Sequence, residues 1–162
     1  HALHHRTGEP MPRDLLDRMV AAQTFDAGFR TVEFTSSALI DMAYHSRADA
    51  PADPAGFEAE TLKSLGMPDA IVMRHRTPHF THVFSGDGYS AGYYSYMWSE
   101  VLDADAFAAF EETGDVFDPA MAEKLRKHIY ASGGAADPEA LYTAFRGKIP
   151  SADAMMAKRG LL

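Results

Sequence analysis

The sequence predicts an all-α fold, and two observations lead to this prediction. Apolar residues recur every three or four positions through most of the chain, which is the spacing of one helix face. The segments with this spacing begin near proline or aspartate and end at glycine, as helices commonly do. With 162 residues, of which 46% are hydrophobic and 23% charged, the chain is expected to form one globular domain over residues 1–162.

Three helices are expected in the first part of the chain. Residues 12–22 begin with a proline suited to the first turn and place apolar side chains on one side. Residues 25–44 repeat apolar positions at helical spacing, which predicts a long, well-packed helix. A proline-rich connection over residues 48–56 then leads to a short helix over residues 57–66, closed by its final glycine.

The pattern changes over residues 67–88, which show no helical period. This stretch contains two prolines, three histidines and two glycines that flank Asp87. It predicts a long irregular loop with a short extended piece at residues 81–84. Loops of this length inside a compact domain are usually functional or disordered, and the aromatic and apolar content here argues against disorder.

Helical spacing returns in the second half of the chain. Residues 89–112 predict a long helix, and a second helix is expected to begin at Asp118 and to stop at the glycine pair 133–134. Residues 137–147 begin with Asp-Pro-Glu and predict a further short helix. Residues 150–162 are expected to add a final turn or two.

Composition and charge exclude several classes of function. The net charge of −8 disfavours nucleic acid and anionic membrane surfaces as partners. No stretch approaches the ~18 consecutive apolar residues of a membrane-spanning helix. The absence of cysteine excludes disulfides and thiolate metal ligands. It also fits a reducing compartment. Together with the habit of the family that the motifs below resemble, this favours a cytoplasmic location.

Three tyrosines in the segment after the loop are candidates for a functional surface. Tyr89, Tyr93 and Tyr96 are spaced i, i+4 and i+7, which would align three phenols along one helix face. Tyr94 and Trp98, with Val101, fall on another face and are expected in the core. An aromatic stripe of this kind can simply pack, but a row of phenols that faces a cleft could hold a carbonyl group or an oxyanion.

Two groups of histidines raise the question of a metal site. His75, His79 and His82 have spacings that could place ligands on one helix, but Pro78 disfavours a continuous helix there. Single histidines that donate to substrate or backbone are therefore favoured. A self-contained metal-binding protein that uses these three histidines is the less favoured alternative.

The histidines at the start of the chain, His1, His4 and His5, resemble the end of a zinc-binding helix. A zinc peptidase of this type needs an HExxH motif, which supplies two ligands and a general base. No HExxH occurs in the 162 residues, so no metal site is expected in this chain.

Residues 82–107, "HVFSGDGYSAGYYSYMWSEVLDADAF", closely resemble the C-terminal segment of the thimet oligopeptidase-like zinc metallopeptidases. The subgroup most similar is the bacterial peptidyl-dipeptidase and oligopeptidase A type. Three other stretches agree in order: "HHRTGEPMPRDLLDRM", "ASGGAADPEALYTAFRGKIPS" and the closing "KRGLL". The resemblance covers essentially the whole chain. It also argues against His1 as a zinc ligand, because position 26, where the family would then have a glutamate ligand, is Asp26.

The resemblance implies a nearly all-helical peptidase with a deep cleft around zinc, of which this chain would be a C-terminal subdomain. It implies that the zinc ligands and the general base lie in a missing N-terminal portion. Carried over to this sequence, it implies that Tyr93 and Tyr96 match a pair of substrate-facing tyrosines. Because a tyrosine hydroxyl can stabilise the charge that develops on the carbonyl oxygen, Tyr96 is the expected oxyanion donor. His82, Tyr89 and Tyr93 would contact the substrate.

Gly86 and Gly88 are expected to let the loop before Tyr89 approach the bound peptide closely and move as it binds, because glycine has no side chain to obstruct it. The expected partners are short peptides and the N-terminal portion of the same polypeptide. Alone, the chain is expected to be inactive, to hold no zinc and to self-associate through apolar surface that the longer protein would cover. The alternative is a non-catalytic helical peptide-binding or adaptor module.

Overall fold

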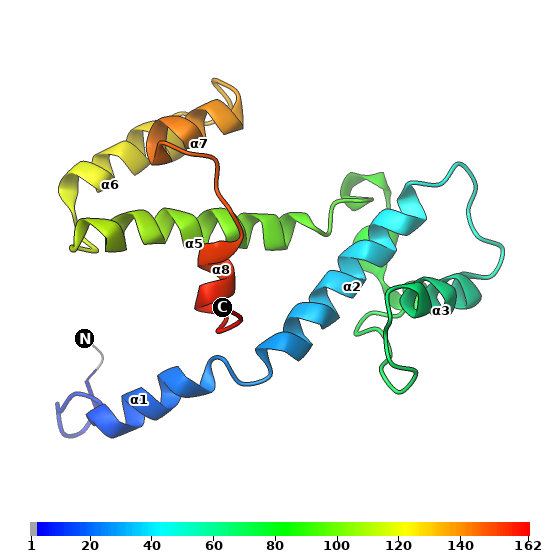
Figure 1. Cartoon of the computed structure of the whole chain (residues 1–162), viewed down its shortest axis with the longest axis horizontal. Coiled ribbons are helices and arrows are strands. Elements are labelled where there is room, and N and C mark those ends of the chain that lie inside the picture. Colours follow the sequence, from blue (N-terminus) through cyan, green and yellow to red (C-terminus); the bar gives the residue numbers. More distant parts are fainter. Residues whose placement is uncertain (1–2) are drawn as a thin grey trace. The chain divides into compact units, whose positions relative to one another are not determined.

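A computed structural model describes residues 3–162, and these residues form helices, turns and no β-strand (Figure 1). The one β-type contact in this range is an isolated antiparallel bridge between Leu3 and Pro10. The all-α prediction is confirmed. Across residues 3–162, no helix combines the length and the apolar character that crossing a membrane requires.

The chain divides into two compact units. The first unit comprises the chain up to Ala91 together with Arg159–Leu161, and the second comprises Gly92–Lys158 together with Leu162. The first unit contains the following helices: α1 (Arg13–Ala22), α2 (Ala27–His45), α3 (Pro54–Ser64), the short 3₁₀ turn η1 (Thr77–His79), α4 (Thr81–Phe84) and the 3₁₀ turn η2 (Asp87–Tyr89).

Local signals define most boundaries in the first unit. Pro12 precedes α1, and Asp53 caps α3 by accepting a hydrogen bond of 3.0 Å from the Gly56 amide. Gly66 adopts a φ of +76° just after α3, a conformation that favours glycine. The helices expected near residues 12–22, 25–44 and 57–66 are therefore present, with small shifts of their ends.

The core of the first unit lies between α3, the second half of α2 and the segment that follows α3. Ile40, Leu62 and Met73 are buried together, and Tyr44 and Met67 pack against them. By contrast, α1 buries no side chain. Large apolar side chains stay exposed along α1 and the first half of α2, and these are Leu15, Leu16, Met19, Val20, Phe29 and Val32. The expectation that residues 25–44 form a well-packed helix thus holds only for their second half.

The prediction of an extended piece at residues 81–84 is wrong, because these residues form helix α4. Phe80 and Val83 are both buried, and their spacing of three residues suits a helical turn. Burial of these two side chains, rather than the local sequence pattern, determines the backbone here. The long loop expected over residues 67–88 therefore holds three short helical turns.

The second unit is built on the long helix α5 (Ser95–Thr113), followed by α6 (Pro119–Leu125), the π turn η3 (Arg126–Tyr130), α7 (Pro138–Arg146) and α8 (Asp153–Lys158). The aspartates before α6 and α7 cap them as predicted: Asp118 accepts from the Met121 amide at 2.6 Å and Asp137 from the Ala140 amide at 3.1 Å. In Figure 1, α6 with η3 and then α7 form a helical hairpin beside α5.

Helix α5 contributes to two buried clusters. Ala109 packs with Tyr142 and Phe145 of α7, while Val101 and Ala104 pack with Met155 of α8. The prediction that Tyr94 and Trp98 join Val101 in the core is wrong, since both aromatic side chains are more than half exposed. In the first turns of α5, Met97 and Val101 are the side chains that contribute to a buried cluster. The rings of Tyr94 and Trp98 lie outside it.

Candidate functional site

The glycine loop, defined here as residues 85–91, follows helix α4 and carries three predicted site residues. Gly86 is extended, and η2 brings Gly88 and Tyr89 into one 3₁₀ turn. A Cβ atom added at Gly86 or Gly88 would meet no other atom within 4 Å. Packing within the chain therefore does not require glycine at these positions, which leaves close approach of a ligand as the predicted reason for them.

The structure brings together His82 and Tyr89, two of the residues that are expected to contact the substrate. Their rings stack with centroids 5.0 Å apart and planes inclined by 12°. His82 extends from α4, and the Tyr89 ring is 65% exposed at the end of η2.

Tyr93 and Tyr96 form a second aromatic pair, which belongs to the second unit. Their ring centroids are 5.5 Å apart in an edge-to-face arrangement. Tyr93 lies in the turn before α5 and is half-buried, whereas Tyr96 lies in the first turn of α5 and is 54% exposed. Neither ring is sealed in the interior.

The prediction of three tyrosines along one helix face is wrong. Helix α5 begins at Ser95, so Tyr89 and Tyr93 precede it. Ala91 adopts a φ of +56°, in the left-handed region that non-glycine residues rarely occupy, and this interrupts any helix through the segment. The phenols are therefore distributed over a 3₁₀ turn, a turn and a helix rather than along one stripe.

A buried carboxylate that the sequence did not single out lies next to the glycine loop. Asp41 of α2 is 1% exposed, and its Oδ1 atom accepts from His45 Nδ1 at 2.7 Å and from the Ala91 amide at 3.0 Å. The four-residue spacing of Asp41 and His45 places them one helical turn apart. This spacing is the only sequence signal that could have indicated the pair.

A second buried carboxylate, Glu58 of α3, holds the chain upstream of α4. Its oxygens accept from the Thr77 amide at 2.6 Å, the Thr77 hydroxyl at 2.8 Å and Arg76 Nε at 3.0 Å. Glu58 thereby fixes the start of η1 and satisfies a charge that burial would otherwise make costly. Nothing in its local sequence predicted this role.

The histidines do not assemble into a metal site. His75 stacks on Phe80 with centroids 5.1 Å apart, while His82 stacks on Tyr89. His4 is near Thr7, whose amide donates to His4 Nδ1 at 3.3 Å, and His1 lies outside the described residues. Within residues 3–162 no three histidine, aspartate or glutamate side chains gather in a way that could hold a metal ion. The described residues therefore do not fit a zinc site.

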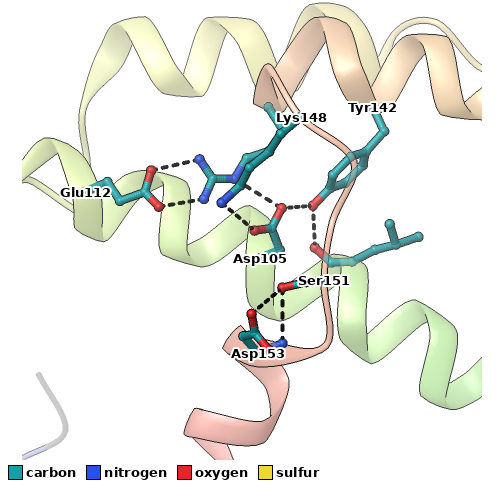
Figure 2. Close-up of polar contacts among 8 residues, drawn as sticks. Asp105, Glu112, Tyr142, Lys148, Ser151 and Asp153 are labelled. Atoms are coloured by element: carbon teal, nitrogen blue, oxygen red, sulfur yellow. Dashed lines mark hydrogen bonds and ion pairs between the residues drawn. The ribbon is translucent and has the colours of Figure 1, made fainter.

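The second unit contains a charged network centred on Asp105 of α5 (Figure 2). Asp105 Oδ2 accepts from the Tyr142 hydroxyl at 2.8 Å and from Arg146 Nε at 3.1 Å. The same Arg146 donates two further hydrogen bonds, of 2.7 and 2.6 Å, to the Glu112 carboxylate. Figure 2 shows Asp105 and Glu112 of α5 with Tyr142 of α7, and Lys148 directed toward Asp105 from the segment after α7. The network fastens α7 to α5.

This network shifts the ionisation of its members. Burial, followed by the hydrogen bond to Asp105, raises the pKa of Tyr142 well above its ordinary value. The hydrogen bond to Glu112 is the main cause that raises the pKa of Arg146. The same bond lowers the pKa of Glu112. All three shifts favour the neutral phenol and the ionised arginine–glutamate pair at neutral pH.

A cavity of about 680 Å³ lies within the second unit. Its lining comes from α5, the end of α6, η3, α7 and the segments before and after α7, and it includes Trp98, Leu125, Ile129 and Ile149. None of the residues predicted for the substrate site lines this cavity. The exposed tyrosine pair and the cavity are therefore separate features of the second unit.

Comparison with known proteins identifies the family. A family model described as peptidase family M3 matches residues 1–161. The chain belongs to peptidase family M3. This confirms the resemblance to thimet oligopeptidase-like peptidases on which the site residues were assigned.

Curated relatives agree with the family M3 assignment. The chain is 39% identical over 162 residues to oligopeptidase A of Escherichia coli, an alignment that covers 98% of the chain and 23% of the relative. It is 38% identical over 165 residues to dipeptidyl carboxypeptidase of Salmonella typhimurium, covering 99% of the chain and 24% of the relative. The probable cytosolic oligopeptidase A of Arabidopsis thaliana is 36% identical with the same coverage. This family M3 chain thus spans about a quarter of the length of its relatives.

Proposed function

We propose that this chain is the C-terminal, substrate-binding subdomain of a zinc metallopeptidase that hydrolyses short peptides in the cytoplasm. The observation that carries the proposal is the family M3 match over residues 1–161, among relatives that are named as peptidases and are about four times as long. The two units would both belong to this subdomain. The name of the plant relative, which contains "cytosolic", supports the proposed location.

Zinc would be held by the N-terminal portion of the same polypeptide, because the described residues of this chain offer no set of ligands for it. When bound, zinc would supply a Lewis acid and an activated water for peptide hydrolysis. The contribution of this chain is to bind the peptide and to stabilise the charge that develops on the carbonyl oxygen.

Tyr96 is the proposed donor to that oxygen. Its phenol lies in the first turn of α5 and is accessible, so its hydroxyl can reach a ligand outside the chain. Tyr93 packs edge-to-face against the Tyr96 ring and restricts its orientation. A donor placed where charge develops lowers the barrier by ~3–4 kcal/mol, because it interacts more strongly with the transition state than with the substrate.

His82 and Tyr89 are proposed to contact the backbone of the bound peptide, together with the Tyr93 hydroxyl. The stacked rings restrict each other, so each hydroxyl or imidazole nitrogen is presented in a narrow range of directions. The open space around Gly86 and Gly88 would allow the loop backbone to approach the peptide.

The test is the substitution Tyr96→Phe in the complete protein, assayed with short peptides. The expected result is a fall in kcat of ~10²–10³ with little change in KM, since the lost bond forms mainly in the transition state. Tyr94→Phe is the matched control, because Tyr94 is a neighbouring phenol with a similar exposed fraction and no assigned role. Equal kinetics for Tyr96→Phe and the parent protein would remove Tyr96 from the oxyanion role.

The competing proposal is a helical peptide-binding or adaptor module without catalysis. The coding sequence upstream of His1 separates the two. An HExxH-encoding stretch supports the peptidase, and a start codon directly before His1 supports the module.

A further inference from the structure

The last turn of α2 contacts the glycine loop at both of its ends. At the start of the loop, the Phe84 ring of α4 packs against Tyr44 and His45, with ring centroids 5.0 and 5.1 Å apart. At its end, the Ala91 amide donates to Asp41 Oδ1 at 3.0 Å. One helical turn therefore holds the two stems of a loop that carries Tyr89 at its tip.

The contact at Ala91 is notable for its backbone conformation. Alanine at a φ of +56° is sterically disfavoured, and such residues persist only where the surroundings hold them. The Asp41 carboxylate is the group that holds it, through a hydrogen bond fifty residues distant in sequence. Strain of this kind gathers at ligand-binding segments, where it sets the direction of the chain.

The orientation of Asp41 is itself determined by a neighbour. His45 Nδ1 lies 2.7 Å from the same Oδ1 atom that accepts from Ala91, so the imidazole fixes which oxygen faces the loop. The His45 ring is held in turn by its contact with Phe84. The carboxylate, the imidazole and the two loop stems thus form one connected cluster, made of Asp41, His45, Phe84 and Ala91.

We propose that Asp41 is a positioning residue for the glycine loop, oriented by His45. By anchoring Ala91 it determines where the loop ends, and so the placement of Tyr89, whose ring stacks on His82 of α4 and would meet the peptide. The consequence for catalysis depends on the proposed function, whereas the anchoring of the loop does not.

The test compares Asp41→Ala with the conservative Asp41→Asn in the complete protein. Amide hydrogen exchange of residues 85–91 should be at least ~10-fold faster in Asp41→Ala, the factor that corresponds to losing a hydrogen bond to a charged acceptor. In Asp41→Asn it should stay close to the parent rate, since the amide oxygen can replace Oδ1 as acceptor. His45→Phe keeps a ring against Phe84 but removes the donor to Asp41, so it should speed exchange in the same segment.

Glu58→Ala is the matched control, because it removes another buried carboxylate from the same unit. It should speed exchange around Thr77, which Glu58 contacts, and leave residues 85–91 unchanged. If Asp41→Ala fails to fold, His45→Phe and Asp41→Asn provide the same comparison. The proposal predicts faster exchange in Asp41→Ala and in His45→Phe. If exchange over residues 85–91 is unchanged in whichever of these two variants folds, the proposal is overturned.

Peptide kinetics provide the second readout. A displaced loop weakens peptide binding, so Asp41→Ala should raise KM by ~10-fold with kcat largely retained. General destabilisation would instead reduce the amount of active protein and lower the apparent kcat at constant KM. Faster loop exchange without any peptidase activity in the parent protein would support the anchor and refute the proposed function. Peptidase activity in the parent protein, with loop exchange unaltered in Asp41→Ala, would support the proposed function and refute the anchor.

Discussion

Replacing Arg146 by alanine removes the cation of the Asp105 network in the second unit. The Arg146 and Asp105 side chains are 7% and 6% exposed, so the change leaves a buried carboxylate beside Tyr142 without its arginine. Removing one partner of a buried ion pair typically costs ~3–5 kcal/mol, because the remaining charge stays desolvated. The Arg146→Ala variant should therefore lose about this much free energy of unfolding.

Arg126 provides a matched control in the same unit. It also donates two hydrogen bonds to a glutamate, at 2.8 and 2.7 Å, but both side chains of this pair are about 60% exposed. Exposed ion pairs contribute ~0–1 kcal/mol, so Arg126→Ala should have little effect. Both arginines make two short hydrogen bonds to a glutamate, but Arg146 is buried and Arg126 is exposed. The difference in stability loss between the two variants therefore measures the effect of burial.

Urea unfolding of the 162-residue chain, followed by the fluorescence of Trp98, measures both variants, because Trp98 is the single tryptophan of these residues and lies in the second unit. For an m-value of ~2 kcal/mol/M, Arg146→Ala should lower the midpoint by ~1.5–2.5 M. Arg126→Ala should lower it by less than ~0.5 M. Equal midpoint shifts for the two variants would refute the claim that burial gives the Asp105 network its strength.

Three further predictions concern single groups and the exposed surface. The Tyr44 hydroxyl is buried without a hydrogen-bond partner among residues 3–162. The Tyr44→Phe variant should therefore have a free energy of unfolding that is unchanged or up to ~1 kcal/mol higher. If urea unfolding shows that Tyr44→Phe is less stable by more than ~1 kcal/mol, the hydroxyl has a partner and the prediction is wrong. The pKa of Glu112 lies below its ordinary value of 4.5, so its ion pair stabilises the fold above that pH and is lost as the pH falls through the lowered value. Stability should accordingly decline more steeply below pH 4.5 in the parent chain than in Glu112→Gln, and parallel pH profiles would exclude this contribution. Finally, the exposed apolar side chains of α1 should make the chain self-associate. Sedimentation should show an average mass that rises with protein concentration, and the rise should be smaller in Val20→Asp. A monomer at all concentrations would count against this prediction.

The helices could be predicted because their signals are local. Asp118 and Asp137 each cap a helix within three residues, and glycines at 114 and 147 end helices with a φ of +81°. The Asp-Pro pairs at these starts need no information from the rest of the fold. The same holds for the family motif, which lies in one continuous segment.

The details of the site could not be predicted because they depend on distant contacts. The backbone at Ala91, stabilised by Asp41 fifty residues earlier, breaks the helical spacing of Tyr89, Tyr93 and Tyr96. Helix α4 forms because Val83 is buried with its neighbours, which the short pattern at residues 81–84 does not reveal. Single buried carboxylates such as Glu58 have no sequence signature until the fold brings their donors to them.

The proposal that this chain is the metal-free part of a zinc peptidase is tested most directly by peptide hydrolysis, with two preparations side by side. The protein encoded by the complete gene should cleave short peptides, lose activity to a chelator and regain it with zinc. The 162-residue chain alone should show no cleavage at any zinc concentration. Zinc-dependent cleavage by the isolated chain, or none by the complete protein, would contradict the account.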